Sequence, residues 1–270
     1  MPTKYAYVDG TAVHYVHGGR GTLPGVVPDL SRGRLFVFLH DAGGNAGIWR
    51  NVASLLDEDH STVAFDFPAH GRSGGTDSPK SIEAYSAFFI ALTKVLALRP
   101  AVLVGHGMGA AVAMETALRA PELVEALILL NATCRCTIPP ETVETWENVM
   151  RGRAPQPFTT EAFSPKTDFA VMRQGWTEQV QTDPRVRYFD LVAWRQYDAA
   201  SRLAEIRSPA MVVAGSDDGI TPPAQAEELQ RGIRGAELTV IPDAGHLLPI
   251  EKPAELAKAI GPIRPMRPIP

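Results

Sequence analysis

The centre of the chain reads Val102-Leu103-Val104-Gly105-His106-Gly107-Met108-Gly109-Ala110. Its apolar β-formers predict a strand, and the glycines that follow predict a sharp turn. A helical pattern begins immediately after the turn, over residues 108–119. A strand that passes directly into a helix is typical of α/β proteins with a parallel sheet.

Strand and helix patterns alternate on both sides of this stretch. Residues 35–39 form an apolar run without polar alternation, which indicates a strand buried on both faces, as in a parallel sheet. A β-hairpin is expected around the turn signal Asp9-Gly10. The alternation indicates right-handed crossovers and a doubly wound sheet. The other predicted strands cover 62–67, 101–105, 127–130, 210–214 and 238–241, and further helices cover 48–56, 81–98, 223–232 and 253–260.

The alternation stops after Asn131, and no strand pattern returns until residue 210. Helical patterns separated by prolines fill this gap, which indicates an insertion into the α/β core. The predicted helices of the insertion cover 141–150, 168–181 and 185–197.

We therefore predict a core made of residues 1–131 and 209–270, with an inserted helical cap of residues 132–208. Large apolar side chains in the cap either roof a pocket or pack inside the cap itself. Those that we consider as substrate contacts are Trp146, Met172, Trp176 and Trp194.

Composition and charge narrow the classes of partner. Hydrophobic residues make up 45% of the chain and charged residues 21%, as in globular proteins. The net charge of −4 disfavours nucleic acid or an anionic membrane as the main partner. Neither a signal peptide nor the ~18 apolar residues of a membrane span is evident, so we expect a cytoplasmic protein. The two cysteines, Cys134 and Cys136, are expected to be ordinary thiols.

The central glycines fit two motifs. One is the nucleophile elbow G-x-S-x-G, in which a serine side chain is exposed above the sheet; here its central position is Gly107. The other is the dinucleotide fingerprint G-x-G-x-x-A. That fingerprint needs an acidic residue at the end of the next strand, where this chain has Asn131, so we favour the elbow.

Two further motifs follow later strands. Residues 215–222 read Gly-Ser-Asp-Asp-Gly-Ile-Thr-Pro, and residues 243–246 read Asp-Ala-Gly-His. A carboxylate and an imidazole are therefore expected at the carboxyl edge of the sheet, where ligands bind in open α/β sheets. The chain order is nucleophile position, acid and then histidine, which is the order of the nucleophile-elbow proteins.

With these motifs the chain resembles the α/β-hydrolase family, in the branch with a helical cap that includes enol-lactonases, C–C bond hydrolases and small esterases. Residues 40–44, His-Asp-Ala-Gly-Gly, are similar to the family's oxyanion loop H-G-x-G-G, and residues 66–73 are similar to D-x-P-G-H-G-x-S. Asp41 and Ala69 stand where the family usually has glycine. The resemblance implies an eight-stranded, mostly parallel sheet flanked by helices.

The resemblance also implies the site residues. Gly107 holds the nucleophile position, Asp218 orients the imidazole of His246, and Asp217 is the less suitable acid because of the family spacing. The backbone N–H groups of Ala42 and Met108 would stabilise an oxyanion. His40 and Asp41 are expected next to the substrate, in addition to the cap residues named above.

The serine hydroxyl of the motif is missing, and three explanations remain open. The chain could be a deliberately disabled variant of a serine hydrolase, made by one designed substitution so that a substrate is kept intact. It could use the His246–Asp218 pair as a general base in a lyase, decarboxylase or cofactor-free oxygenase reaction. It could also be a binding protein or receptor without catalysis. Glycine itself relieves strain at an elbow with positive φ.

The predicted substrate is a small to medium, largely uncharged ester, lactone, amide or activated C–C compound. No cofactor and no metal are expected, and the chain is predicted to be a monomer or homodimer. The last ten residues are expected to be frayed because of their prolines. Four arginines of the cap are expected to face solvent rather than the substrate: Arg173, Arg185, Arg187 and Arg195.

Overall fold

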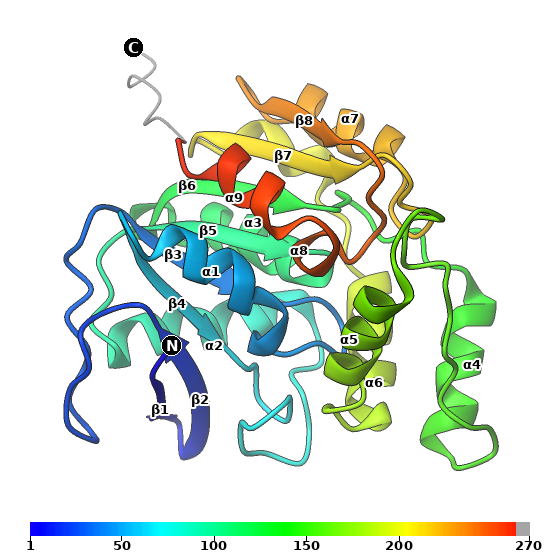
Figure 1. Ribbon diagram of the computed structural model, residues 1–270, viewed down its shortest axis with the longest axis horizontal. Helices are drawn as coiled ribbons and strands as arrows, with labels where there is room; N and C mark the ends of the chain where they lie inside the picture. Colours follow the sequence, from blue (N-terminus) through cyan, green and yellow to red (C-terminus); the bar gives the residue numbers. More distant parts are fainter. Residues whose placement is uncertain (263–270) are drawn as a thin grey trace.

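The computed structural model of the chain describes residues 1–262, and its central feature is an eight-stranded sheet (Figure 1). The strand order is β1-β2-β4-β3-β5-β6-β7-β8. β1 and β2 form the antiparallel hairpin, and the strands from β4 to β8 in this order run parallel. The strands are β1 Thr3–Val8, β2 Thr11–His17, β3 Leu35–Leu39, β4 Ser61–Phe65, β5 Ala101–His106, β6 Val124–Leu130, β7 Ala210–Gly215 and β8 Glu237–Ile241.

Helices cover both faces of this sheet, so the predicted α/β fold class is confirmed. The helices are α1 Arg50–Leu56, α2 Ile82–Val95, α3 Met108–Arg119, α4 Pro140–Met150, α5 Phe169–Gln179, α6 Pro184–Arg195, α7 Pro223–Gly232, α8 Leu248–Glu251 and α9 Pro253–Ile260, with 3-10 turns at Ala46–Trp49, Pro121–Leu123 and Ala200–Glu205. None of these helices is long and apolar enough to cross a bilayer.

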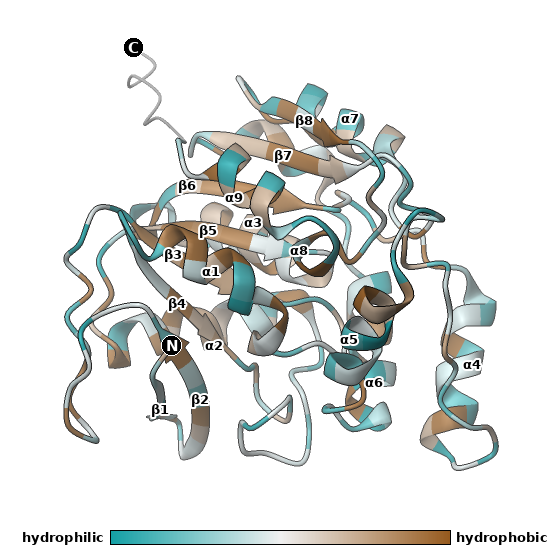
Figure 2. Ribbon diagram, viewed as in Figure 1, coloured by the Kyte–Doolittle hydropathy of each residue, from teal (hydrophilic) through white to brown (hydrophobic). Residues whose placement is uncertain are grey.

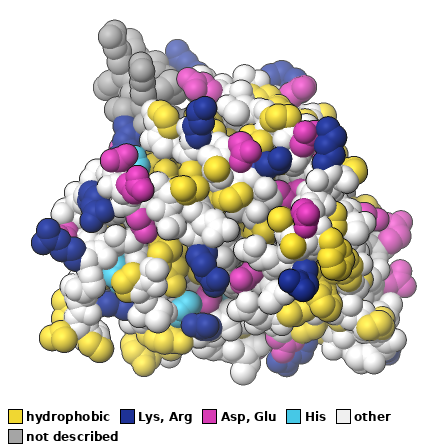
Figure 3. Space-filling view, viewed as in Figure 1, with side chains coloured by type: hydrophobic (Ala, Val, Ile, Leu, Met, Phe, Trp, Pro, Cys, Tyr) yellow, Lys and Arg dark blue, Asp and Glu magenta, His cyan; other side chains and the backbone are white. Residues whose placement is uncertain are grey.

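Alternate residues of the central strands face two different core layers. Leu35, Val37 and Leu39 pack with buried residues of α2 and α3, whereas Phe36 and Phe38 pack with those of α1 and α9. This explains why the strand sequence is apolar at every position, and Figure 2 shows these strands as the hydrophobic centre of the molecule. On the face shown in Figure 3, basic and acidic side chains are interspersed.

The structure differs from the predicted elements at the start of β6. This strand begins at Val124, three residues earlier than the apolar pattern indicates. The reason is Glu125, which interrupts the pattern and pairs with Arg34 at 3.2 Å. The prediction of a frayed C-terminal tail falls mainly on residues 263–270, which lie outside the described residues.

The turn between β5 and α3 consists of a single residue, Gly107, with φ +53° and ψ −115°. This positive φ favours glycine. Gly109 is required for a different reason, because a Cβ on it would lie 2.3 Å from the carbonyl oxygen of Leu39 in β3. The glycines thus let α3 begin directly at the sheet.

The insertion between β6 and β7 carries α4, α5 and α6, which lie beside the carboxyl ends of the parallel strands (Figure 1). The predicted cap boundaries, residues 132 and 208, stay a prediction. Asp190 of α6 connects this insertion to the core. Its carboxylate accepts hydrogen bonds from the Gly43 N–H at 2.7 Å, from His70 Nε2 at 2.7 Å and from the Tyr85 hydroxyl.

We predict that Asp190→Ala lowers the free energy of unfolding by about 3–5 kcal/mol, because it leaves His70, Tyr85 and an amide buried without their acceptor. Chemical denaturation measures the change. The matched control is Asp183→Ala on the same helix, an exposed N-cap whose loss costs about 1 kcal/mol. Equal effects of the two substitutions would show that Asp190 is not the anchor of α6.

Candidate active site

Four loops at the carboxyl edge of the sheet bring the predicted site residues together. Asp41 follows β3, Met108 begins the helix after β5, Asp218 follows β7, and His246 follows β8. Asp218 and His246 are both buried.

Asp218 and His246 form a hydrogen-bonded pair. His246 Nδ1 lies 2.9 Å from Asp218 Oδ2, and Asp218 also accepts hydrogen bonds from the backbone and hydroxyl of Thr221. The neighbouring Asp217 instead accepts from Ser164 at 2.5 Å. The structure therefore places Asp218, and not Asp217, in position to orient the imidazole.

The carboxylate of Asp41 lies between His246 and the start of α3. Its Oδ1 accepts a hydrogen bond from the Met108 N–H at 2.7 Å, and its Oδ2 lies 3.2 Å from His246 Nε2. A Cβ on Gly107 would lie only 2.1 Å from Asp41 Oδ1. Asp41 thus occupies the space where the elbow pattern has a serine, and it engages one of the two predicted oxyanion donors.

This arrangement puts one imidazole between two carboxylates. Burial favours the neutral ring, but the charges and hydrogen bonds of Asp218 and Asp41 outweigh burial and raise the pKa of His246 to about 10. Burial likewise favours the neutral acid of Asp41, yet the hydrogen bond and charge of His246 hold its pKa below the ordinary value. At neutral pH the site is therefore a carboxylate–imidazolium–carboxylate row, and His246 has no free position for a proton.

A cavity of ≈ 330 Å³ opens above this row, between the sheet edge and the insertion. Asp41, Ala42 and His246 line it from the core, and Trp146 and Trp194 line it from α4 and α6. The cavity is thus placed to hold a small compound against the predicted catalytic groups.

Three predicted substrate contacts lie elsewhere. His40 is fully buried, its Nε2 accepts the Phe67 N–H at 3.1 Å, and its Nδ1 lies 2.8 Å from the Asp41 carbonyl oxygen, so it supports the loop beneath the cavity. Met172 packs against the small cluster around Phe163. The ring of Trp176 meets that of Phe158. None of the three lines this cavity.

The expectation that Arg187 faces solvent is wrong. Its side chain lines the cavity, and two of its nitrogens, Nε and Nη1, are buried. The sequence gives no sign of this, because the face of α6 that meets the core depends on tertiary packing. Arg173, Arg185 and Arg195 are exposed, as expected.

Asn131, which the sequence marks only by the absence of the fingerprint's acid, positions the loops around His246. Its buried amide donates to the carbonyl oxygens of Gly245 at 3.0 Å and His246 at 2.6 Å, and its Oδ1 accepts the Gly215 N–H at 2.9 Å. His106 Nε2 also donates to the His246 carbonyl, at 2.7 Å. A polar residue at the end of an apolar strand was the available signal.

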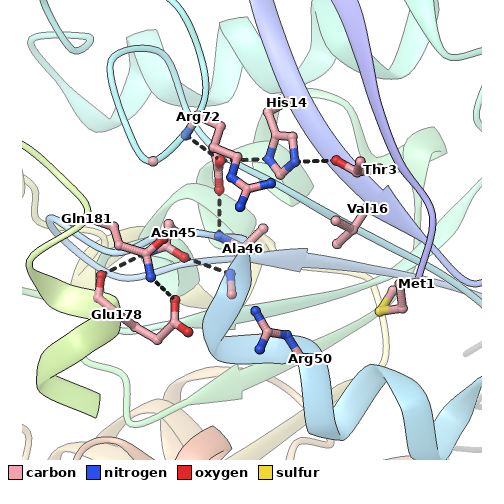
Figure 4. Close-up of a pocket in the computed structure, with 13 residues that line it drawn as sticks. Met1, Thr3, His14, Val16, Asn45, Ala46, Arg50, Arg72, Glu178 and Gln181 are labelled. Atoms are coloured by element: carbon pink, nitrogen blue, oxygen red, sulfur yellow. Dashed lines mark hydrogen bonds and ion pairs between the residues drawn. The ribbon is translucent and has the colours of Figure 1, made fainter. Parts of the chain in front are cut away.

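The loop after β3 is held from below by Asp66. Its oxygens accept hydrogen bonds from the N–H groups of Ala46 and Arg72 and contact His14 Nδ1 at 2.8 Å, beside a second pocket (Figure 4).

Ala69, one of the two departures from family glycines, has φ +67°, so it keeps the left-handed turn despite its Cβ. Among residues 1–262 there is no group of three or more side chains that could hold a metal ion.

Comparisons with known proteins agree with this fold. The model of the alpha/beta hydrolase family matches residues 36–259. A protein of Azorhizobium caulinodans assigned as the carbamate hydrolase RutD is 25% identical over 86% of this chain and 91% of its own length.

Solved structures show the same fold. A thermophilic esterase from Thermogutta terrifontis superposes with a TM-score of 0.83 at 21% identity, covering 96% of this chain and 97% of that chain. The enol-lactonase from Burkholderia xenovorans superposes with a TM-score of 0.81 at 23% identity, covering 95% of this chain and 97% of that chain.

The row of charges formed by Asp218, His246 and Asp41 (the charge row) predicts that the stability of the protein depends on pH. Because folding raises the pKa of His246 from 6.5 to about 10, its stabilising contribution is complete below pH 6.5 and is lost as the pH rises towards 10. Asp41→Asn removes one carboxylate, so the imidazole should lose its proton at lower pH and this stability loss should become smaller. Nuclear magnetic resonance of the imidazole and denaturation at several pH values measure both effects.

The control is Asp217→Asn, which removes a nearby carboxylate that does not touch His246. An imidazole that titrates near 6.5 in the unchanged chain would contradict the charge row.

Proposed function

Because the chain belongs to the alpha/beta hydrolase family, we propose that its cavity is the substrate site of a hydrolase for small esters, lactones or carbamates, in a form without the serine nucleophile. The names of the relatives support these substrate classes. The cavity supports a small compound with an apolar part, since its volume is ≈ 330 Å³ and Ile138, Trp146 and Leu191 are among the residues that line it. Amide and activated C–C substrates stay predictions.

The position of the Asp41 carboxylate carries this proposal. Serine-type acyl transfer needs a hydroxyl at residue 107, a neutral histidine and free oxyanion donors. Here the hydroxyl is absent, His246 holds its proton, and the Met108 N–H is bonded to Asp41. The chain is therefore proposed to bind its substrate without forming a serine acyl-enzyme.

Two of the departures from the family pattern, Gly107 and Asp41, lie next to each other. A serine at 107 would collide with the present position of Asp41, and a glycine at 41 would leave this space empty. This contact supports a paired change of the two residues over a single designed substitution at 107.

Catalysis by the Asp41 carboxylate is a second candidate, and the contact between Asp41 and His246 favours it. Asp41 Oδ2 would attack the substrate carbonyl carbon, and the leaving alkoxide would take the proton of His246. The resulting mixed anhydride has no charge on Asp41, so the pKa of His246 falls. His246 would then take one proton from the water that cleaves the anhydride, and the second proton would leave with the product acid.

We predict that the double variant Asp41→Gly with Gly107→Ser hydrolyses an activated ester such as p-nitrophenyl acetate at least ~10³-fold faster than the unchanged chain, because loss of a triad nucleophile costs on the order of 10⁶. Gly107→Ser alone should gain far less, since Asp41 blocks the hydroxyl. Serine at positive φ should also lower the free energy of unfolding by about 1–3 kcal/mol.

Covalent labelling by a fluorophosphonate provides an independent measurement. His246→Ala in the double variant is the control, and it should abolish the gained rate. A double variant that folds but neither hydrolyses esters nor takes up the label would refute the hydrolase site.

Isotope labelling separates the two candidates. If Asp41 is the nucleophile and water cleaves the anhydride at the aspartyl carbonyl carbon, turnover of esters by the unchanged chain in H2¹⁸O should place ¹⁸O in the Asp41 side chain. Mass spectrometry of the Asp41 peptide measures the label, and Asp41→Asn should lose both label and turnover. No turnover in the unchanged chain supports the form without a nucleophile, and turnover with an unlabelled Asp41 excludes water attack at the aspartyl carbon of an anhydride.

A further inference from the structure

Arg187 projects from α6 into the cavity and is held there by two contacts. Its guanidinium carbon lies 4.5 Å from the ring centre of Trp146, which fits a cation–π contact. Its aliphatic stem covers Gly43, where an added Cβ would lie 2.6 Å from Arg187 Cβ and Cγ. The side chain is therefore fixed at the cavity wall.

The guanidinium lacks the partners that such a buried group needs. Nε and Nη1 are buried and make no hydrogen bond to any residue of the described chain. Arginine keeps its charge in proteins, and burial of an unpaired charge is costly. Burial accordingly lowers the pKa of Arg187 from its ordinary value, although Asp41 and Asp190 act against this.

The two carboxylates whose charges act on Arg187, Asp41 and Asp190, are already engaged by other donors. Asp41 accepts from Met108 and contacts His246, and Asp190 accepts from Gly43, His70 and Tyr85. Within residues 1–262, neither forms an ion pair with Arg187 within 4.0 Å. The other acidic residue that lines the cavity, Glu161, is exposed to solvent.

We propose that Arg187 binds a carboxylate of the substrate, so that this cavity takes monoanionic compounds that carry a free carboxylate beside the ester, lactone or carbamate group. The ester, lactone or carbamate part of this proposal rests on the proposed function, whereas the carboxylate part rests on Arg187 alone. A substrate carboxylate would supply the acceptors that Nε and Nη1 lack, and guanidinium and carboxylate match in geometry. The expectation of a largely uncharged substrate is thereby replaced by that of an anion.

Binding of half esters tests the inference without requiring catalysis. The probes are the monomethyl esters of succinate, glutarate and adipate and their dimethyl esters, and calorimetry measures the affinities. We expect the unchanged chain to bind at least one half ester about tenfold or more tightly than its dimethyl ester, as for hydrogen bonds to charged groups. Arg187→Met should reduce this preference to about twofold or less, and Arg187→Lys should retain part of it.

Arg195→Met is the matched control, because it removes an exposed positive charge from the same helix. It should keep the full preference. Without ligand, Arg187→Met should not lower the denaturation midpoint, whereas an arginine with a purely structural role would lower it. Retained preference in Arg187→Met, equal binding of both ester types or no binding at millimolar concentration would each overturn the inference.

Hydrolysis assays with the same compounds distinguish the two proposals. If half esters bind through Arg187 but the Asp41→Gly, Gly107→Ser double variant cleaves none of them nor p-nitrophenyl acetate, the hydrolase proposal fails and the carboxylate site stands. If the double variant cleaves both ester types with equal kcat/KM, the carboxylate site fails and the hydrolase proposal stands.

Discussion

The carboxylate of Asp41 can lie at the end of β5 only because residue 107 has no side chain. The backbone at this turn has a positive φ, and glycine adopts it without a steric penalty. The carboxylate of Asp41, from the loop after β3, fills the space beside Gly107. It accepts a hydrogen bond from the Met108 N–H and contacts His246 Nε2. These two polar groups at the carboxyl edge therefore have partners although residue 107 carries no hydroxyl.

The exchange of a neutral hydroxyl for a charged carboxylate changes the chemistry of the whole site. His246 has a second negative neighbour, and the charges and hydrogen bonds of Asp218 and Asp41 raise the pKa of its imidazole despite its burial. α6 then contributes two charges with different roles. Asp190 is saturated with donors and anchors the insertion, whereas Arg187 on the same helix lacks partners and faces the cavity. One helix thus carries both the carboxylate that anchors the insertion and the guanidinium that we propose as a ligand-binding group.

Most of the fold could be predicted from local patterns. Apolar runs such as 35–39, the glycines around residue 107 and the break after Asn131 each report on short stretches of backbone, and they predict strands, a turn and an insertion. The family motifs likewise identify Asp218 and His246, because their order and spacing are local properties. The exceptions have local causes too, as at β6, where Glu125 interrupts the apolar pattern.

The amino-acid sequence by itself determined the α/β fold class, the order of the site residues and the absence of a hydroxyl at 107. Only the tertiary structure decided what fills that space and which arginine reaches the cavity. Asp41 and Gly107 are 66 positions apart, and Arg187 meets Gly43 and Trp146 through helix packing. Contacts of this kind depend on how separate strands and helices are brought together, and no periodicity within one segment encodes them.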